Sequence, residues 1–218
     1  MVFDLDGTLI DSRQDLANSV NEMLGSYGAA PLSLEAVTGM IGDGARQLVE
    51  RALAAASVNA LPSDALVRFL SIYDRRLLEQ TRPYPGLVDV VRAAATRASL
   101  ALITNKPETP SRRLLEAFGI CDCFQWVIGG DSGFAKKPDP ASLRHVIRLA
   151  AATPLTTLFV GDSHVDIETA RNAGTRMCAV LYGFGEVREA ISWSGDDLIA
   201  PAPGDVGPII ERFLAGGH

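Results

Sequence analysis

The segment Val2-Phe3-Asp4-Leu5-Asp6-Gly7-Thr8-Leu9 decides the fold that the sequence predicts. Val2 and Phe3 favour a buried strand, and Gly7 marks a turn or a place where a ligand comes close. In an extended chain, Asp4 and Asp6 would share one face. Two carboxylates this close repel each other, so a shared proton, a basic partner or a divalent cation must offset the repulsion. Taken alone, the segment is more typical of a polar turn after a strand.

Later segments repeat this arrangement of an apolar strand that runs into polar residues. Leu100–Ile103 leads into Thr104-Asn105-Lys106, Leu158–Val160 leads into Gly161–Asp166, and Lys136–Pro140 lies between them. In an open parallel α/β sheet, ligands bind in the crevice outside the carboxyl ends of the strands. The pattern therefore predicts that six distant polar residues converge: Asp4, Asp6, Thr104, Lys137, Asp162 and Asp166.

The rest of the chain divides into a helical stretch and a β/α alternation. From about Arg13 to Arg82, apolar residues recur at helical spacing and no alternating run of strand length interrupts them. Arg82–Gly86 is the expected return hinge, since its prolines restrict the chain and its glycine frees it. Strands and helices then alternate, which indicates a parallel sheet. Beyond Gly183 we expect a short helix, a weak strand at Leu198-Ile199 and a final helix from about Val206 to Leu214.

The predicted fold class is therefore α/β, with a doubly wound parallel-sheet (Rossmann-like) core and an inserted α-helical cap domain. Residues 1–12 and 83–218 would form the core, and residues 13–82 the cap. An insert directly after the first strand is expected to act as a lid over the carboxyl ends of the strands.

Composition excludes several classes of partner. The 218 residues are 47% hydrophobic, which is ample for a core, and 20 basic against 26 acidic residues give a net charge of −6. No basic patch for nucleic acid is visible. No apolar run is long enough to span a membrane, and Met1-Val2-Phe3 is too short for a signal peptide. We expect a cytoplasmic monomer or homodimer that acts on a small molecule, without nucleic acid or membrane partners.

The cysteines and one histidine receive no functional role. Cys121, Cys123 and Cys178 form neither an even set nor a C-x-x-C pair, so small, partly buried thiols are favoured over metal or redox sites. His164 lies between two carboxylates of the predicted site, but a solvent-facing loop histidine is the favoured interpretation.

Together, these motifs resemble those of the haloacid dehalogenase superfamily of phosphotransferases. Asp4-Leu5-Asp6-Gly7-Thr8 is similar to its first motif, Thr104 to the second, Lys137 to the third, and Gly161-Asp162 with Asp166 to the fourth. Four motifs in this order are specific jointly, although each is weak alone. Relatives usually carry more residues before the first motif, so the first strand is either short or truncated at its start.

The resemblance implies a mechanism. Asp4 would be the nucleophile that forms an aspartyl-phosphate, and Asp6 the general acid and then the base. Mg²⁺ would bind to Asp4, to the backbone carbonyl of Asp6 and to Asp162, with Asp166 orienting these ligands from close by. Thr104 and the backbone at Asn105 would donate hydrogen bonds to the phosphoryl oxygens, and Lys137 would add a positive charge. Outside this set of motifs, Thr104 would be a strand-end cap and Lys137 a solvated lysine.

The resemblance also narrows the substrate. Dehalogenases of the family lack the second aspartate, so Asp6 favours a phosphate ester. Thr8, Thr104-Asn105-Lys106 and Gly129-Gly130-Asp131 are similar to the phosphoglycolate phosphatase branch. The implied function is Mg²⁺-dependent hydrolysis of a small phosphate monoester, with 2-phosphoglycolate as the best candidate. A sugar phosphate, a nucleotide or pyrophosphate remains an alternative substrate, and a non-catalytic binding protein on the same scaffold remains an alternative function.

Arg46 is the candidate for recognising the substrate's second anionic group. In Ile41–Leu48, Gly42 and Gly44 precede a helix, so free backbone amides and the helix start favour a small anion there. In the branch that this sequence resembles, the corresponding loop faces the core. Arg46 could therefore pair with a substrate carboxylate, but a solvated helix arginine explains the sequence equally well.

Overall fold

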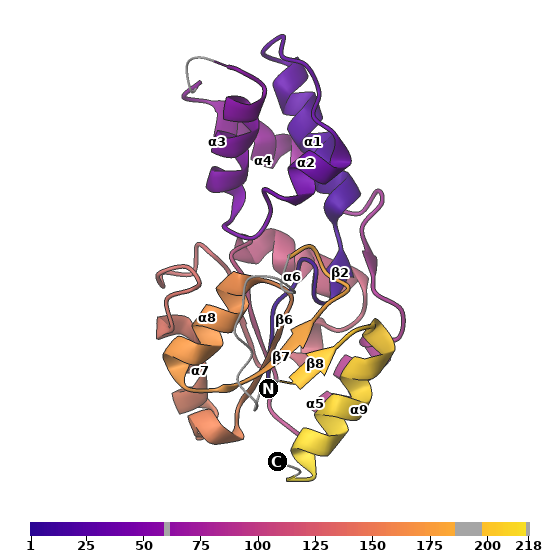
Figure 1. The fold of residues 1–218 in the computed structure, drawn as a ribbon, viewed down its shortest axis with the longest axis vertical. Coiled ribbons are helices and arrows are strands. Elements are labelled where there is room, and N and C mark those ends of the chain that lie inside the picture. The colour runs from indigo at the N-terminus through magenta and orange to yellow at the C-terminus, as the bar shows by residue number, and fades with distance from the viewer. Residues whose placement is uncertain (59–61, 186–197, 217–218) are drawn as a thin grey trace.

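The computed structural model describes residues 1–58, 62–185 and 198–216, and strands in these ranges form a six-stranded parallel sheet in the order β5-β4-β1-β6-β7-β8 (Figure 1). The strands are β1 (Val2–Phe3), β4 (Ala101–Ile103), β5 (Trp126–Ile128), β6 (Leu158–Gly161), β7 (Arg176–Val180) and β8 (Leu198–Ala200). The chain leaves β1 toward β4 on one side and returns to β6 on the other, so β1 lies at the switch point of the sheet. The predicted doubly wound sheet is confirmed.

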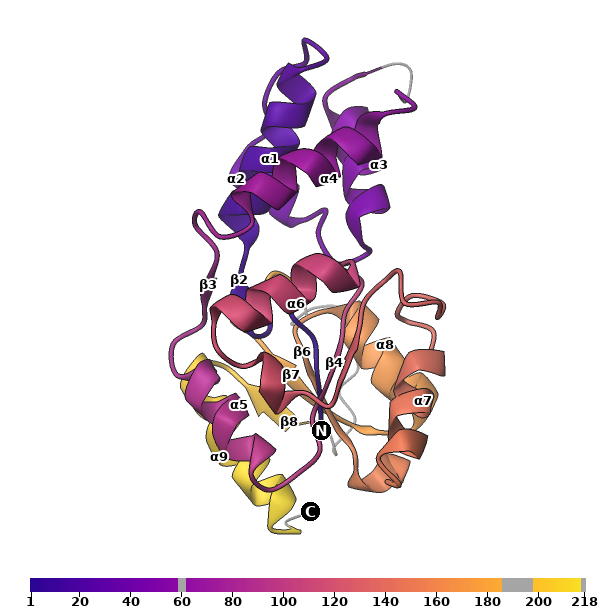
Figure 2. The ribbon, with the colours of Figure 1, turned by 180° about the vertical axis from the view of Figure 1, so that it is seen from behind.

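Helices cover both faces of the sheet (Figure 2). Helices α5 (Leu87–Ala95), α6 (Glu108–Ala117) and α9 (Pro203–Leu214) pack on one face, and α7 (Ala141–Leu149) with α8 (His164–Ala173) on the other. Two 3₁₀ turns, Cys121–Cys123 and Pro154–Thr156, complete the connections between these described elements. The predicted strands at Leu100–Ile103, Leu158–Val160 and Leu198-Ile199 agree with β4, β6 and β8, and the predicted final helix agrees with α9, each to within a few residues.

Alternation of side chains along β1 separates two hydrophobic clusters. Phe3 packs in the cluster that includes Val91 of α5, whereas Val2 packs in the cluster that includes Leu143 of α7. Successive strand residues point to opposite faces, so a strand covered on both faces is apolar throughout. Because both faces are covered, the polar residues that follow β1 lie at its end rather than within the sheet.

A group of helices lies between β2 (Ile10–Asp11) and β3 (Arg82–Pro83), at one end of the molecule (Figure 1). These are α1 (Arg13–Gly25), α2 (Leu34–Thr38), α3 (Ala45–Ala55) and α4 (Ala65–Arg76), and we call them the helical insert. Their apolar residues at three- and four-residue spacing, such as Val20, Leu53 and Phe69, are buried against one another. The division of the chain into a cap domain at 13–82 and a core stays a prediction.

The two chain segments that connect the helical insert to the sheet, β2 and β3, lie side by side. Ile10 pairs with Pro83 and Asp11 with Arg82 in an antiparallel ribbon. Next to it, the fully buried carboxylate of Asp15 accepts hydrogen bonds from the backbone N–H groups of Gln80 and Thr81 and from the Thr81 hydroxyl, at 2.7–2.9 Å. The expected hinge is thus a short strand pair, which the sequence did not predict because two residues are too few to show alternation.

Two further predictions differ from the structure or lie outside it. Strand β1 ends at Phe3 rather than near Leu5, because the Leu5 carbonyl accepts hydrogen bonds from Thr8, Leu9 and Ile10 in a tight loop. The short helix expected beyond Gly183 falls in residues 186–197, outside the described ranges. Within the ranges that the structure does describe, no helix combines the length and the apolar character needed to cross a bilayer.

Candidate active site

The predicted site residues lie at the carboxyl ends of neighbouring strands, beneath the helical insert. Asp4 follows β1, Thr104 follows β4, and Asp162 follows β6, while Lys137 comes from the loop after β5. All four side chains are buried, as is Asp166 in the first turn of α8. The structure thus brings together residues that are far apart in the sequence.

Three carboxylates and one ammonium group form the centre of this site. Asp4, Asp162 and Asp166 each place a carboxylate oxygen within 4.8 Å of the others. Lys137 Nζ lies 2.7 Å from Asp4 Oδ1 and 2.6 Å from Asp166 Oδ1. The second oxygen of Asp166 accepts hydrogen bonds from the backbone N–H and the hydroxyl of Ser163, at 3.0 and 2.6 Å. Asp166 is therefore held from both sides.

Asp162 is positioned by the first motif and by the loop after β7. Thr8 Oγ1 donates a hydrogen bond of 2.9 Å to Asp162, and the backbone N–H groups of Phe184 and Gly185 donate at 2.8 and 3.2 Å. Gly7 has φ +86°, and a Cβ atom there would lie 2.2 Å from Asp162 Oδ2. Only glycine leaves room for the carboxylate at this position.

The charge of the centre is unbalanced in the metal-free protein. Burial raises the pKa of Asp4, the ammonium of Lys137 lowers it, and the carboxylates of Asp166 and Asp162 raise it further. Burial and the Asp166 carboxylate also raise the pKa of Asp162. Three ionised carboxylates against one ammonium leave an excess of two negative charges, which two protons or one divalent cation would neutralise.

Asp4 Oδ1 is buried and receives no well-directed hydrogen bond. These hard oxygen donors fit a divalent cation.

Asp6 lies apart from the acidic centre and faces a different base. Lys106 Nζ lies 3.1 Å from both carboxylate oxygens of Asp6, and Ser12 Oγ donates a hydrogen bond of 2.5 Å to one of them. Sequence reasoning quoted Lys106 as part of a motif but assigned it no role. Lys106 follows Thr104 by two residues in the loop after β4, but this place in the sequence does not show that it faces Asp6.

The side chain of Asn105 is fully used by the protein. Its Nδ2 donates to the backbone oxygens of Gly42 and Lys137, at 3.0 and 3.2 Å, and its Oδ1 accepts from the Lys137 N–H at 3.0 Å. Asn105 therefore positions Lys137 and contacts the helical insert. Its backbone N–H makes no hydrogen bond within the described residues. Thr104 Oγ1 accepts from the Lys106 N–H at 3.3 Å, which leaves its own hydrogen free to donate.

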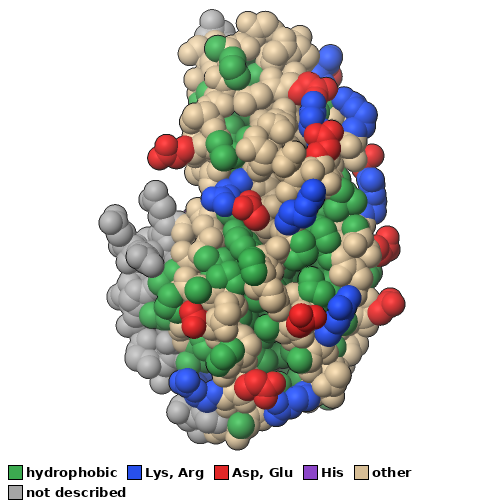
Figure 3. Space-filling view, turned by 90° about the vertical axis from the view of Figure 1, so that its right-hand side faces the viewer, with side chains coloured by type: hydrophobic (Ala, Val, Ile, Leu, Met, Phe, Trp, Pro, Cys, Tyr) green, Lys and Arg blue, Asp and Glu red, His purple; other side chains and the backbone are tan. Residues whose placement is uncertain are grey.

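A small cavity of about 60 Å³ lies between these residues and the helical insert. From the core it is bordered by Asp4, Asp6, Thr104 and Lys106, and from the insert mainly by apolar side chains and by Tyr73. We call it the inner cavity. Figure 3 shows the helical insert resting on the sheet-bearing part of the molecule, with charged side chains of both signs along the boundary.

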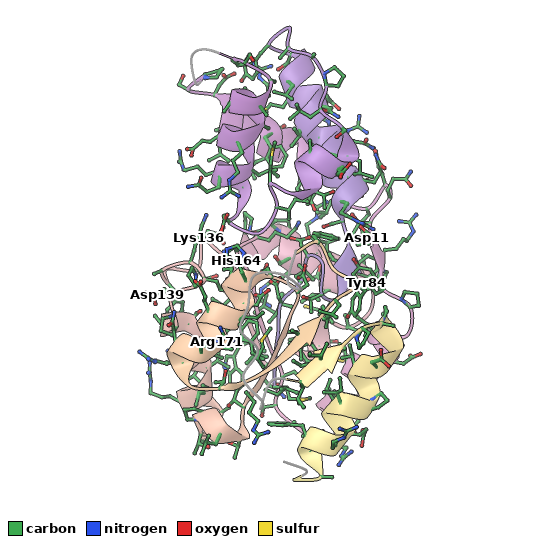
Figure 4. All side chains as sticks on the ribbon, viewed as in Figure 1. Asp11, Tyr84, Lys136, Asp139, His164 and Arg171 are labelled. Carbon is green, nitrogen blue, oxygen red and sulfur yellow. The ribbon has the colours of Figure 1, made fainter. Side chains whose placement is uncertain are left out.

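An adjoining outer cavity of about 380 Å³ contains Arg46 and Lys136. The side chain of Arg46 is 65% exposed, 4.0 Å from Glu50, and does not line the inner cavity. Figure 4 places Lys136 and His164 near the boundary between insert and core. His164 is exposed, as predicted, but it is the first residue of α8 rather than part of a loop, and Cys178 is a fully buried free thiol, whereas Cys121 and Cys123 are partly buried as predicted.

A doubly wound sheet, an acidic centre at its switch point and a helical insert beside it are typical of hydrolases with a Rossmann-like core. The chain belongs to the haloacid dehalogenase-like hydrolase family, whose sequence model matches residues 1–180. The family predicted from the sequence motifs, and the hydrolase class, are confirmed.

Within this family, the chain is similar to proteins named phosphoglycolate phosphatase. One of Pseudomonas putida is 44% identical over 99% of this chain and 82% of its own length. "Phosphoglycolate phosphatase 1" of Pseudomonas aeruginosa is 42% identical over 86% of this chain and 71% of its own length. The crystal structure of "a predicted phosphoglycolate phosphatase" from Haemophilus somnus has a TM-score of 0.86 at 33% identity, covering 95% of this chain and 96% of that one.

Proposed function

We propose that this protein is a Mg²⁺-dependent phosphatase that hydrolyses 2-phosphoglycolate through an aspartyl-phosphate. The observation that carries the proposal is the inner cavity, which Asp4, Asp6 and a lysine border together and which the helical insert encloses. The names of the relatives support the same substrate.

In the first step, a carboxylate oxygen of Asp4 attacks the phosphorus in line with the ester oxygen. The Asp4 oxygen–phosphorus bond forms while the bond from phosphorus to the ester oxygen breaks, and Asp6 gives its proton to the departing alkoxide. Glycolate leaves, and Asp4 carries the phosphoryl group. The separate position of Asp6, held by Ser12 and Lys106 away from the acidic centre, suits a proton donor on the leaving-group side.

In the second step, Asp6 takes a proton from a water molecule that attacks the phosphoryl group. The bond from phosphorus to the Asp4 oxygen breaks, inorganic phosphate leaves, and both carboxyl groups return to their starting states. Dividing one displacement into two in this way lowers the barrier of each.

The phosphoryl oxygens are bound by Thr104, Asn105 and Lys137 in this proposal. The Thr104 hydroxyl and the Asn105 backbone N–H are donors without another acceptor among the described residues. Lys137 carries a positive charge next to Asp4: burial lowers its pKa, but the charges of Asp166 and Asp4 raise it more, so the net shift is upward. Fixed donors of this kind stabilise charge that develops during phosphoryl transfer.

Mg²⁺ would be held by Asp4, the Asp6 carbonyl and Asp162, with Asp166 orienting these groups through its contacts with Lys137 and Ser163. When bound, the cation would supply the charge that lets the carboxylates and a phosphate dianion share one buried site.

Residues 13–82 would act as the cap in this proposal, closing the site and excluding water during turnover. Arg46 stays a candidate for binding the substrate carboxylate, for which its side chain would have to turn from Glu50 into the inner cavity. The cytoplasmic location and the monomeric or homodimeric state also stay predictions.

A panel of phosphate esters assayed with the purified protein tests the proposal. We expect 2-phosphoglycolate to have the highest kcat/KM, ahead of sugar phosphates, nucleotides and pyrophosphate. EDTA should abolish the activity and Mg²⁺ restore it, with Ca²⁺ a poor substitute because it prefers more ligands at longer distances. No phosphate release from any ester, including p-nitrophenyl phosphate, would favour the non-catalytic alternative.

A further inference from the structure

The ammonium group of Lys106 joins the core to the helical insert; in the proposed steps it only helps to hold Asp6 and has no contact with the substrate. Its Nζ is buried, lies 3.1 Å from both carboxylate oxygens of Asp6, and donates a hydrogen bond of 2.6 Å to Tyr73 Oη. The same nitrogen lies 4.4 Å from the centre of the Tyr73 ring. Asp6 belongs to the core and Tyr73 to α4, so Lys106 lies where the two enclose the inner cavity.

Lys106 is the one basic side chain among the described residues that line the inner cavity. Much of the wall that faces it is apolar, formed by Leu16, Ile41, Leu48, Phe69 and Leu70. An anionic group without a partner is strongly disfavoured in such surroundings. For a substrate whose phosphate lies beside Asp4, Lys106 is the basic side chain of the inner cavity that can serve as counter-ion to a second negative group.

Tyr73 adds a second donor at the same place. Its oxygen accepts the hydrogen bond from Lys106, and its own O–H makes no hydrogen bond to another described residue. Burial raises the pKa of Tyr73 to about 12, so the hydroxyl keeps its proton at neutral pH. An ammonium and a phenol side by side can each donate to one oxygen of a carboxylate.

We propose that Lys106 and Tyr73 bind the carboxylate of the substrate and so select phosphate esters of small hydroxy acids. This assignment rests on the proposed function and deepens it. In 2-phosphoglycolate the carboxyl carbon lies two bonds from the ester oxygen, and Asp6, which faces that oxygen in the proposed steps, contacts Lys106 directly. Ser12 Oγ, 2.5 Å from Asp6, holds the acid in place when Lys106 turns to the substrate.

The test compares 2-phosphoglycolate with 2-hydroxyethyl phosphate, in which a neutral CH₂OH group replaces the carboxylate. Replacing Lys106 also removes the partner of Asp6, which should lower kcat/KM for both esters. The readout is therefore the ratio of kcat/KM for 2-phosphoglycolate to kcat/KM for 2-hydroxyethyl phosphate, in which this shared effect cancels. Lys106→Met should lower this ratio roughly thirtyfold and Tyr73→Phe roughly fivefold, the scale of a charged and a neutral hydrogen bond. Lys136→Met, the same change at an exposed lysine outside the inner cavity, should leave the ratio unchanged.

Lys106→Arg keeps the charge and should keep the preference for 2-phosphoglycolate. Equal losses on both esters in Lys106→Met would overturn the proposal, since Lys106 would then act only on Asp6 or on closure. If Lys106→Met does not fold, Tyr73→Phe decides, and an unchanged ratio in that variant overturns the proposal.

A binding measurement separates this inference from the proposed function. Calorimetric binding of glycolate in the presence of inorganic phosphate should weaken roughly tenfold or more in Lys106→Met. Unchanged glycolate affinity would contradict carboxylate recognition by Lys106 even in an active enzyme. A parent protein that binds glycolate and yet hydrolyses neither ester would contradict the proposed function. If Lys106→Met then lost glycolate binding, the carboxylate site would still be supported.

Discussion

The side-chain Nδ2 of Asn105 donates a hydrogen bond of 3.0 Å to the backbone oxygen of Gly42. The contact joins the loop after β4, which also carries Thr104, to the loop that precedes α3. Gly44, two residues further on, lies against the same part of the core, since a Cβ atom there would approach the Asn105 oxygen to 2.9 Å. The side chain that contacts the helical insert therefore also positions Lys137.

Gly44→Ala should impair closure without unfolding the protein. The new methyl group would meet Lys136 Nζ at 2.7 Å and the backbone oxygen of Asn105 at 2.9 Å, which disfavours the closed form. We expect kcat/KM for 2-phosphoglycolate to fall roughly tenfold to a hundredfold, the scale of about 1–3 kcal/mol of local strain. Steady-state kinetics and thermal unfolding measure the two effects separately.

Gly42→Ala is the matched control for this change. Gly42 also has a positive φ, +126°, but a Cβ atom there would meet no heavy atom within 4 Å apart from its own residue and its two neighbours in the chain. Its kcat/KM should change by roughly threefold or less, since only backbone preference is affected. Equal losses in the two variants would mean that strain within the loop, rather than contact with the core, limits turnover.

Asp4→Asn should abolish both turnover and phosphoenzyme formation while the fold is kept. The amide is nearly isosteric but is a poor nucleophile, so kcat should fall roughly a thousandfold or more. The metal-free variant should unfold at the same or a higher temperature than the parent protein, because a buried carboxylate is removed from an acidic cluster. Asp89→Asn, at an exposed carboxylate on α5, serves as the control. Retained activity above roughly 1% would refute the nucleophile assignment.

Mg²⁺ should stabilise the protein more at higher pH. Burial raises the pKa of Asp4 to about 8 in the metal-free protein, whereas an unfolded chain has carboxyl pKa values of about 4. Between these values the folded protein holds a proton that the unfolded chain has released, so this group's contribution to stability falls as pH rises. Mg²⁺ must displace that proton, and its stabilising effect therefore grows over the same range.

Thermal unfolding with Mg²⁺ and with EDTA, at about pH 6 and about pH 8.5, measures this linkage. The difference in Tm between the two conditions should be larger at the higher pH. A difference that is independent of pH would show that the acidic centre is already ionised without metal.

Arg46→Ala tests the role predicted for Arg46 from the sequence. If its guanidinium turns inward to bind the carboxylate, kcat/KM for 2-phosphoglycolate should fall roughly tenfold to a hundredfold, the scale of one charged hydrogen bond. Hydrolysis of p-nitrophenyl phosphate, which lacks the carboxylate, should hardly change. Similar losses on both substrates would assign Arg46 to folding or closure instead.

The sheet and the acidic centre could be predicted because their signals are local. Asp4, Thr104 and Asp162 each directly follow an apolar strand, and the carboxyl ends of parallel strands meet at one edge. The order of the four motifs along the chain then identified the family, although no contact between their side chains was known.

Lys106 and the strand pair β2–β3 could not be predicted in this way. Lys106 contacts Tyr73, which belongs to α4. In the sequence, the spacing of Tyr73 from the other apolar residues of this helix indicates only that it lies on a buried face. The β2–β3 ribbon consists of two-residue strands from segments that are far apart in the sequence, and it exists because Asp15 and the helices next to it bring these segments together.

The pairing of Asp11 with Arg82 also bears on how proteins of this architecture can diversify. The chain leaves the sheet and returns to it at adjacent points, so a short turn could join these points in place of the intervening helices. Mutations that lengthen, exchange or delete those helices would leave the sheet and its strand ends geometrically unchanged. Such changes would replace Tyr73 and the other insert residues that border the inner cavity, while Asp4 and Asp162 kept their places at the strand ends.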